Sequence, residues 1–335
     1  MRLVALFFSL VMLGSVAAAE KGQVIGAASY SMPDWFKPLF GDIQIDAEEA
    51  DDVGKHLILF MHLKNCPYCA KMLDENFRDG PTKDRIERDF DVVGINIEGN
   101  IEVAFNEDMV LEERELADRL NVRSTPSILF INGANELVLR VDGYRSNGAF
   151  EKVLDFVSGR HYESQSFDDY LAARNDAPDW EFPSRPEFTD SADLAAFSEG
   201  PMAILFESPT CAVDCQATYD TLLEDPTIAP LTGLMPIVRL NMMSEESIKG
   251  FDGADTTPKA LAKSLGAVHA PSWALMIDGE VHRVIGSRLV AFHFGGSFGY
   301  LAERGYEKFE SRADYRNHRQ AQLIDAGFDI DYRIK

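Results

Sequence analysis

Four cysteines in two close pairs are the side chains of this chain best suited to chemistry. Cys66 and Cys69 form a C-x-x-C pair, and Cys211 and Cys215 form a C-x3-C pair. A thiolate is the nucleophile of disulfide exchange, and a second thiol one helical turn away can resolve the mixed disulfide. We therefore interpret Cys66 as an attacking nucleophile and Cys69 as its resolving thiol.

The position of the first pair along the chain supports this interpretation. An apolar segment typical of a buried strand, His56–His62, ends just before it, and Pro67 suits the first turn of a helix that follows through Phe77. The N–H groups at a helix start stabilise a thiolate. An inert buried pair and half of a zinc site are the alternatives. The loop is too small for a structural disulfide to stabilise the fold, and the strand-to-helix junction favours redox chemistry.

The segments around this pair predict a mixed sheet covered by helices. We expect strands at 56–62 and 91–97, helices at 46–52, 112–120 and 149–157, and a hairpin formed by 127–131 and 136–141. This order of elements is typical of an α/β domain with helices on both faces of its sheet.

The same pattern returns in the second half of the chain. Cys211 lies 145 residues after Cys66, and Pro271 lies 145 residues after Pro126. Several matches at one offset indicate an internal repeat, so we predict two tandem domains. The expected organisation is a signal peptide at 1–19, domain 1 at 20–175, a Pro-rich linker at 176–189, domain 2 at 190–310 and a C-terminal helical extension at 311–335.

These motifs carry a family resemblance. The strand–CPYC–helix unit, followed by Thr125-Pro126 before a strand, resembles the thioredoxin fold. Met32–Lys37 (MPDWFK), CPYCAKML and Ile95–Asn100 (INIEGN) are more closely similar to the periplasmic SoxW-type thioredoxins. The resemblance implies thiol–disulfide exchange on exported proteins and a cis-proline at Pro126 that helps to hold a partner peptide. The substrate-binding residues it implies are Tyr68, Thr125 and Pro126, with Ala270 and Pro271 in domain 2.

The first site departs from thioredoxin in the groups that could move a proton. Phe60 stands where thioredoxin has a buried Asp, and Asn65 replaces its Trp. Proton transfer at Cys69 would then use water, His62 or Lys71, and His62 could tune the pKa of Cys66.

The second pair leaves three interpretations open. It has no intervening proline, and Asp214 stands where the offset would place the second cysteine. A disulfide between residues four apart needs a distorted first helical turn, and a neighbouring carboxylate disfavours a thiolate. The pair could be a second redox centre, a reducible structural disulfide, or a remnant in a domain that only binds partners.

The composition and the N-terminal residues limit which partners and which cellular compartment we expect. The 335-residue chain has 46% hydrophobic residues and a formal net charge of −23, which argues against nucleic acid or an anionic membrane surface as partner. Arg2, the apolar run Leu3–Leu13 and the Ala17/Ala19 ending are typical of a cleaved secretory signal, so we expect a periplasmic protein without a spanning segment after cleavage. No motif indicates a cofactor or metal.

Together these observations predict an exported protein thiol–disulfide oxidoreductase. Its expected partners are thiols or disulfides of other exported proteins and a membrane electron-transfer protein. The residues do not decide the direction of electron flow, whereas the resemblance favours a reductase. The alternative is a protein-binding or chaperone-like module that uses thioredoxin folds with little redox activity in domain 2.

Overall fold

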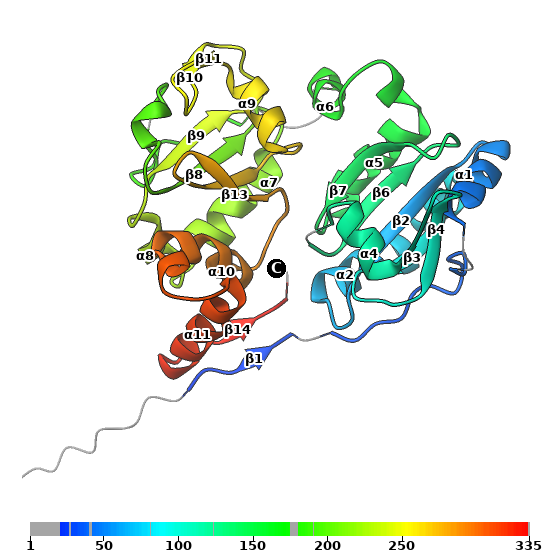
Figure 1. Cartoon of the computed structure of the whole chain (residues 1–335), viewed down its shortest axis with the longest axis horizontal. Helices are drawn as coiled ribbons and strands as arrows, with labels where there is room; N and C mark the ends of the chain where they lie inside the picture. Colours follow the sequence, from blue (N-terminus) through cyan, green and yellow to red (C-terminus); the bar gives the residue numbers. More distant parts are fainter. Residues whose placement is uncertain are drawn as a thin grey trace, which may run out of the picture.

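The computed structural model describes residues 21–26, 28–39, 42–80, 82–122, 124–174, 180–189 and 191–333. The predicted signal peptide and residues 175–179 of the linker lie outside the described residues. Two four-stranded sheets, each with its own helices, lie side by side (Figure 1). We call residues 28–174 the first unit and residues 180–333 the second unit.

The sheet of the first unit is built around one buried strand. Its strands are β2 (His56–His62), β3 (Phe90–Asn96), β6 (Ser127–Ile131) and β7 (Leu137–Asp142), in the order β3-β2-β6-β7. β2 runs parallel to β3 and antiparallel to β6, and β6 is antiparallel to β7. Because both faces of β2 are covered, its residues are apolar almost throughout rather than alternating.

Helices cover both faces of this sheet. The face with Ile58 and Phe60 packs against the helices that follow the cysteine pair, and the face with Leu57 and Leu59 packs against the others. On the first face are α2 (Pro67–Met72), the π-helical η1 (Leu73–Arg78), α3 (Lys83–Asp89), α5 (Asn147–Ser158) and α6 (Phe167–Arg174). On the second are α1 (Ile43–Asp52), α4 (Glu113–Arg119) and the hairpin β4 (Glu102–Asn106)–β5 (Met109–Glu112).

The second unit has a sheet of the same order and strand directions. β8 (Pro201–Glu207), β9 (Ile237–Asn241), β12 (Ser272–Ile277) and β13 (Glu280–Ile285) are arranged as β13-β12-β8-β9, with β8 parallel to β9 and the other pairs antiparallel. Its helices are α7 (Ala212–Thr218), η4 (Tyr219–Leu223), α8 (Ala229–Thr232), α9 (Pro258–Leu265), α10 (Ala291–Ala302) and α11 (Arg312–Asp325). The second unit also has a small hairpin of β10 (Ile248–Lys249) and β11 (Asp255–Thr256). The two units contain three short 3-10 turns: η2 (His161–Glu163) in the first, and η3 (Ala195–Phe197) and η5 (Gly305–Glu307) in the second.

Glycines let α10 and α11 pack closely in the second unit. A Cβ on Gly299 of α10 would collide with the hydroxyl oxygen of Tyr315 on α11, and Gly295 faces the Arg319 side chain. The predicted C-terminal extension therefore adds a helix to the core of the second unit. The Gly295-Gly296 pair of the sequence serves this packing.

A short parallel pairing joins the two ends of the described chain. β1 (Val24–Ile25) pairs with β14 (Ile330–Asp331), and Lys21 forms an ion pair of 2.7 Å with Asp325. Further along the same N-terminal segment, Lys37 bridges to β3 of the first unit. The segment thus lies against the second unit at one end and the first unit at the other (Figure 1). We call the β1–β14 pairing the terminal clasp.

Among the described residues, we find no helix that combines the length and apolar character needed to span a bilayer.

Candidate active site

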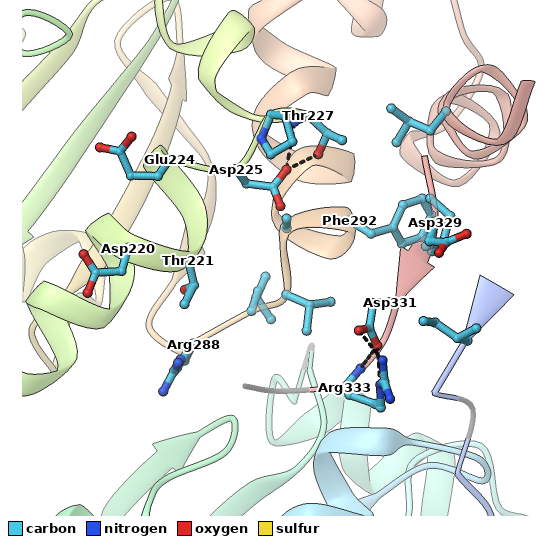
Figure 2. A pocket seen from close by; sticks show the side chains of 17 residues that line it. Asp220, Thr221, Glu224, Asp225, Thr227, Arg288, Phe292, Asp329, Asp331 and Arg333 are labelled. Atoms are coloured by element: carbon cyan, nitrogen blue, oxygen red, sulfur yellow. Dashed lines mark hydrogen bonds and ion pairs between the residues drawn. The ribbon is translucent and has the colours of Figure 1, made fainter. Parts of the chain in front are cut away.

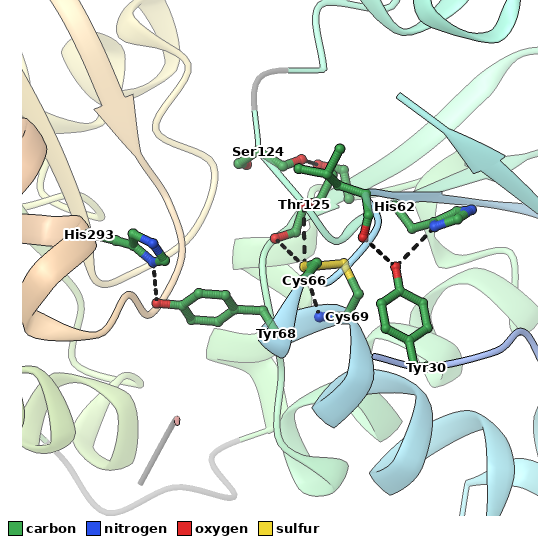
Figure 3. The surroundings of a disulfide bond; sticks show 10 residues. Tyr30, His62, Cys66, Tyr68, Cys69, Ser124, Thr125 and His293 are labelled. Carbon is green, nitrogen blue, oxygen red and sulfur yellow. Dashed lines mark hydrogen bonds between the residues drawn. A yellow bond between two sulfur atoms is a disulfide. The ribbon is translucent and has the colours of Figure 1, made fainter. Parts of the chain in front are cut away.

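Cys66 and Cys69 form a disulfide at the start of α2 (Figure 3). Cys66 is the N-cap residue, Pro67 opens the helix, and the two Cα atoms are 5.2 Å apart. Cys66 is 7% exposed and Cys69 is fully buried. Of the two cysteines, only Cys66 has exposed surface, which a nucleophile for an external sulfur would need.

Two donors point at the sulfur of Cys66. The backbone N–H of Cys69 donates to Cys66 Sγ at 3.1 Å, and the Thr125 hydroxyl donates to it at 3.4 Å. When the disulfide is reduced, these donors would stabilise a thiolate on Cys66. The site thus has the electrostatic feature that thiol–disulfide exchange requires.

The Thr125–Pro126 segment lies against the disulfide, as the resemblance implies. The peptide bond between these residues is cis, and the Thr125 carbonyl oxygen is 3.6 Å from Cys66 Sγ. The chain then enters β6, the neighbour of β2, so the sheet itself places Thr125 beside Cys66.

Three residues that the sequence analysis singled out near Cys69 are Phe60, His62 and Lys71. Phe60 is fully buried in the same core cluster as both cysteines. Burial lowers the pKa of His62 to about 4, so this imidazole is neutral at pH 7. Its Nδ1 lies 3.0 Å from the hydroxyl of Tyr30, which donates to the Leu63 carbonyl. Lys71 pairs with Glu75 one turn further along the helix. Tyr30 was not predicted from the sequence.

Tyr68, between the two cysteines, contacts the second unit. Its hydroxyl accepts a hydrogen bond of 2.7 Å from the Val290 N–H. The same hydroxyl lies 3.1 Å from Nδ1 of His293 (Figure 3). Burial, with the charge of Arg316, lowers the pKa of His293 to about 4. The neutral imidazole can therefore accept a hydrogen bond that the Tyr68 hydroxyl donates to Nδ1. The residue predicted to bind substrate is occupied by another part of the same chain.

Cys211 and Cys215 also form a disulfide, with their Cα atoms 5.4 Å apart. Cys211 is the N-cap residue of α7, with φ −95° and ψ 12°, so it lies outside the regular helix. Its ψ departs from the helical value, which is the local distortion of the first turn that the sequence predicted for a bridged pair four residues apart. The Ser208 N–H donates to Cys211 Sγ at 3.4 Å, and Cys215 is fully buried.

A cavity of about 290 Å³ lies between the two units in front of Cys211. Cys211, Asp214 and Ala270 form one wall, and α5 and α6 of the first unit form the other. A smaller adjoining hollow contains Pro271, and the Ala270–Pro271 peptide bond is cis. The structure therefore brings the predicted residues of the second site together.

Glu207 is a buried carboxylate close to this second pair in sequence, and it was not predicted. It is the last residue of β8 and has no exposed surface. Burial raises its pKa, while Trp180, Tyr219 and the charge of Arg239 act in the opposite direction. The signal in the sequence that could have indicated a buried carboxylate is the glutamate that ends the otherwise apolar segment MAILFE.

A further cavity, away from both cysteine pairs, contains neither cysteine nor histidine among its lining residues in the described part of the chain. This cavity of about 550 Å³ lies beside the terminal clasp and is lined by acidic side chains with Arg288 and Arg333 (Figure 2). No group of three or more His, Cys, Asp or Glu side chains suited to a metal occurs within the described part of the chain.

Comparisons with known proteins agree with the geometry of the first unit. Residues 43–158, about a third of the chain, match the family model described as a thioredoxin-like domain. The chain therefore contains a thioredoxin-like domain, with Cys66 and Cys69 as its C-x-x-C pair. No curated protein sequence matches this chain.

Solved thioredoxin-fold structures are also similar to part of the chain. A thioredoxin-fold protein from Helicobacter pylori shows 22% identity and a TM-score of 0.32, over 36% of this chain and 80% of its own. A putative disulphide-isomerase from Bacteroides thetaiotaomicron shows 23% identity and a TM-score of 0.30, over 42% of this chain and 100% of its own. A thioredoxin from Thermus thermophilus shows 24% identity and a TM-score of 0.29, over 37% of this chain and 87% of its own.

Proposed function

We propose that this protein is an exported thiol–disulfide oxidoreductase that acts on cysteines of other periplasmic proteins through Cys66 and Cys69. The observation that supports it most is the disulfide at the start of α2, with the Cys69 N–H and the Thr125 hydroxyl both directed at Cys66 Sγ. In reduction, the Cys66 thiolate attacks a client disulfide, and Cys69 then attacks Cys66 Sγ to release the reduced client.

The reductase direction and the compartment belong to this proposal. The SoxW-type resemblance of MPDWFK, CPYCAKML and INIEGN supports a reductase supplied with electrons by a membrane protein. The secretory pattern of residues 1–19 supports export to the periplasm. Fractionation of cells producing the full chain would test the compartment.

Insulin reduction with dithiothreitol as electron source tests the activity. We expect catalysis by the wild-type protein and by a Cys211→Ser/Cys215→Ser variant, and none when Cys66→Ser is added to that variant. Equal rates for this variant with and without Cys66→Ser would contradict the proposal and favour a binding or chaperone-like module.

We also propose that the second unit is a second thioredoxin-like copy and that Cys211–Cys215 is a second exchange centre. The strands of the two sheets have the same order and the same directions, which supports the proposal that the second unit is a copy of the first. The cavity in front of Cys211 supports the exchange, because it gives a client sulfur room to approach. If mass-tag alkylation shows that this pair never becomes reduced in a dithiothreitol titration, it is a structural disulfide.

A further inference from the structure

The proposed exchange site is covered by a segment from the other half of the chain. Gly286–His293, which leads from β13 into α10, extends along the first unit, and we call it the covering segment. Within it, the Val290 N–H and the His293 imidazole meet the Tyr68 hydroxyl. Tyr68 is only 5% exposed, although it lies between the two cysteines.

The contacts extend beyond these two hydrogen bonds. At the start of the covering segment, the Arg145 guanidinium donates to the Gly286 carbonyl at 2.9 Å. Leu289 packs against the core clusters of both units, and Val290 packs against the cluster that contains Cys66. The covering segment therefore buries apolar side chains of the first unit and also forms hydrogen bonds with Arg145 and Tyr68.

Residues next to the terminal clasp also contact the covering segment. The His293 ring stacks on Tyr332, with centroids 5.0 Å apart and an interplanar angle of 10°. Tyr332 follows β14, and its N–H donates to the Ile25 carbonyl of the N-terminal segment. The chain next to the clasp therefore contacts the covering segment through Tyr332.

We propose that the covering segment is an autoinhibitory contact, so that a polypeptide client reaches Cys66 only after this segment leaves Tyr68. This inference rests on the proposed function. A client brings a backbone as well as a sulfur to the site, whereas a small thiol needs little room beside Cys66.

The gated step is ordinary disulfide exchange. The Cys66 thiolate attacks one sulfur of the client disulfide, and the other client sulfur leaves as a thiolate. Cys69 then attacks Cys66 Sγ, which releases the second client thiolate and regenerates the Cys66–Cys69 disulfide. Two electrons pass from the Cys66–Cys69 dithiol to the client, and dithiothreitol restores the dithiol.

Two substitutions in the second unit loosen the contact without changing the exchange site. Val290→Pro removes the N–H donor, and φ of −68° at Val290 suits proline. His293→Phe removes Nδ1 and keeps a ring to stack on Tyr332. The matched control is His318→Phe, an exposed histidine of α11 that contacts Phe309 instead.

Insulin reduction is compared with reduction of a small disulfide, 5,5′-dithiobis(2-nitrobenzoate). Each substitution should raise the insulin rate about fivefold, the equivalent of one lost hydrogen bond of ~1 kcal/mol, and leave the small-disulfide rate unchanged. His318→Phe should match the wild type for both. Unchanged insulin rates in both variants would overturn the autoinhibitory contact, whereas the absence of Cys66-dependent activity on either substrate would overturn the proposed function instead.

Hydrogen exchange provides a readout that does not depend on those variants. A Cys69→Ser protein that carries an insulin chain as a mixed disulfide on Cys66 is compared with the same protein without client. Residues 286–293 should exchange faster in the mixed disulfide. Equal protection of these amides in both samples would show that the client binds without displacing the covering segment.

Discussion

At the residue scale, the chemistry centres on the sulfur of Cys66. The Cys69 N–H and the Thr125 hydroxyl lie 3.1 and 3.4 Å from it, and both would favour the thiolate. The spacing of the cysteines predicted that Cys66 and Cys69 act as a pair, and they form a disulfide. The family resemblance placed Thr125 beside them. Tyr30 and Glu207 could not be predicted, because their importance depends on burial and on neighbours distant in sequence.

Removing the resolving thiol should trap a client on the protein. In Cys69→Ser, reduced Cys66 can still attack a client disulfide, but no second thiol releases the product. We expect a stable mixed disulfide, visible as a mass increase under non-reducing conditions. Both variants are made with Cys211→Ser and Cys215→Ser, so that only the first pair can react. Cys66→Ser is the control and should trap none, and trapping by that variant would assign the nucleophile to Cys69.

His62 should have little effect on the reactivity of Cys66. Burial lowers the pKa of His62 to about 4, so the ring carries no charge between pH 5 and 8. We expect His62→Gln to leave the pH profile of Cys66 alkylation by iodoacetamide unchanged. A rise of one unit or more in the apparent thiol pKa would show that a charged His62 stabilises the thiolate.

At the element scale, the sequence predicted the strands better than the helix ends. The expected strand 56–62 is β2, because an uninterrupted apolar segment admits few alternatives. The β4–β5 hairpin was missed, since its residues are partly exposed and mixed in polarity. β1 and β14 have two residues each and form only by pairing with each other, so no local pattern indicates them.

The contact between α10 and α11 should depend on Gly299. A Cβ there would collide with the Tyr315 hydroxyl and crowd Leu231, so Gly299→Ala should lower the free energy of unfolding by about 1–3 kcal/mol. Gly233→Ala is the matched control, because a Cβ at Gly233 meets nothing within 4 Å. Urea denaturation followed by tryptophan fluorescence measures both, and an equal midpoint for the two variants would contradict the packing account.

At the scale of the whole molecule, each unit completes the surroundings of the other unit's cysteine pair. The covering segment lies on Tyr68, and α5 and α6 close the cavity in front of Cys211. The repeat indicated two similar domains, but a single sequence contains no pattern that shows how they pack. Tyr68 was predicted to face a client, because nothing near it in sequence reveals His293 225 residues later.

The contact between the units should weaken in acid through His269. Its Nε2–H donates to the Arg140 carbonyl at 3.2 Å, and burial, with the charge of Arg145, lowers its pKa to about 4, while Asp142 acts in the opposite direction. Between pH 6.5 and 4 the unfolded chain binds a proton that the folded protein does not. The free energy of unfolding should therefore decrease as the pH is lowered from 6.5 to 4, by up to about 3 kcal/mol from this group.

His269→Gln keeps a donor for the Arg140 carbonyl but does not titrate. Its urea midpoint should fall less than that of the wild type between pH 6.5 and 4. Parallel pH profiles for the two proteins would contradict the assignment.

A redox titration of the protein against dithiothreitol and glutathione, with each cysteine pair followed by mass-tag alkylation, tests the central claim most directly. For an exchange centre, we expect Cys66–Cys69 to titrate reversibly as a two-electron couple, near about −270 mV for a reductase. A pair that stays oxidised below about −300 mV would be a structural disulfide, and the assignment of Cys66 as a nucleophile would be wrong.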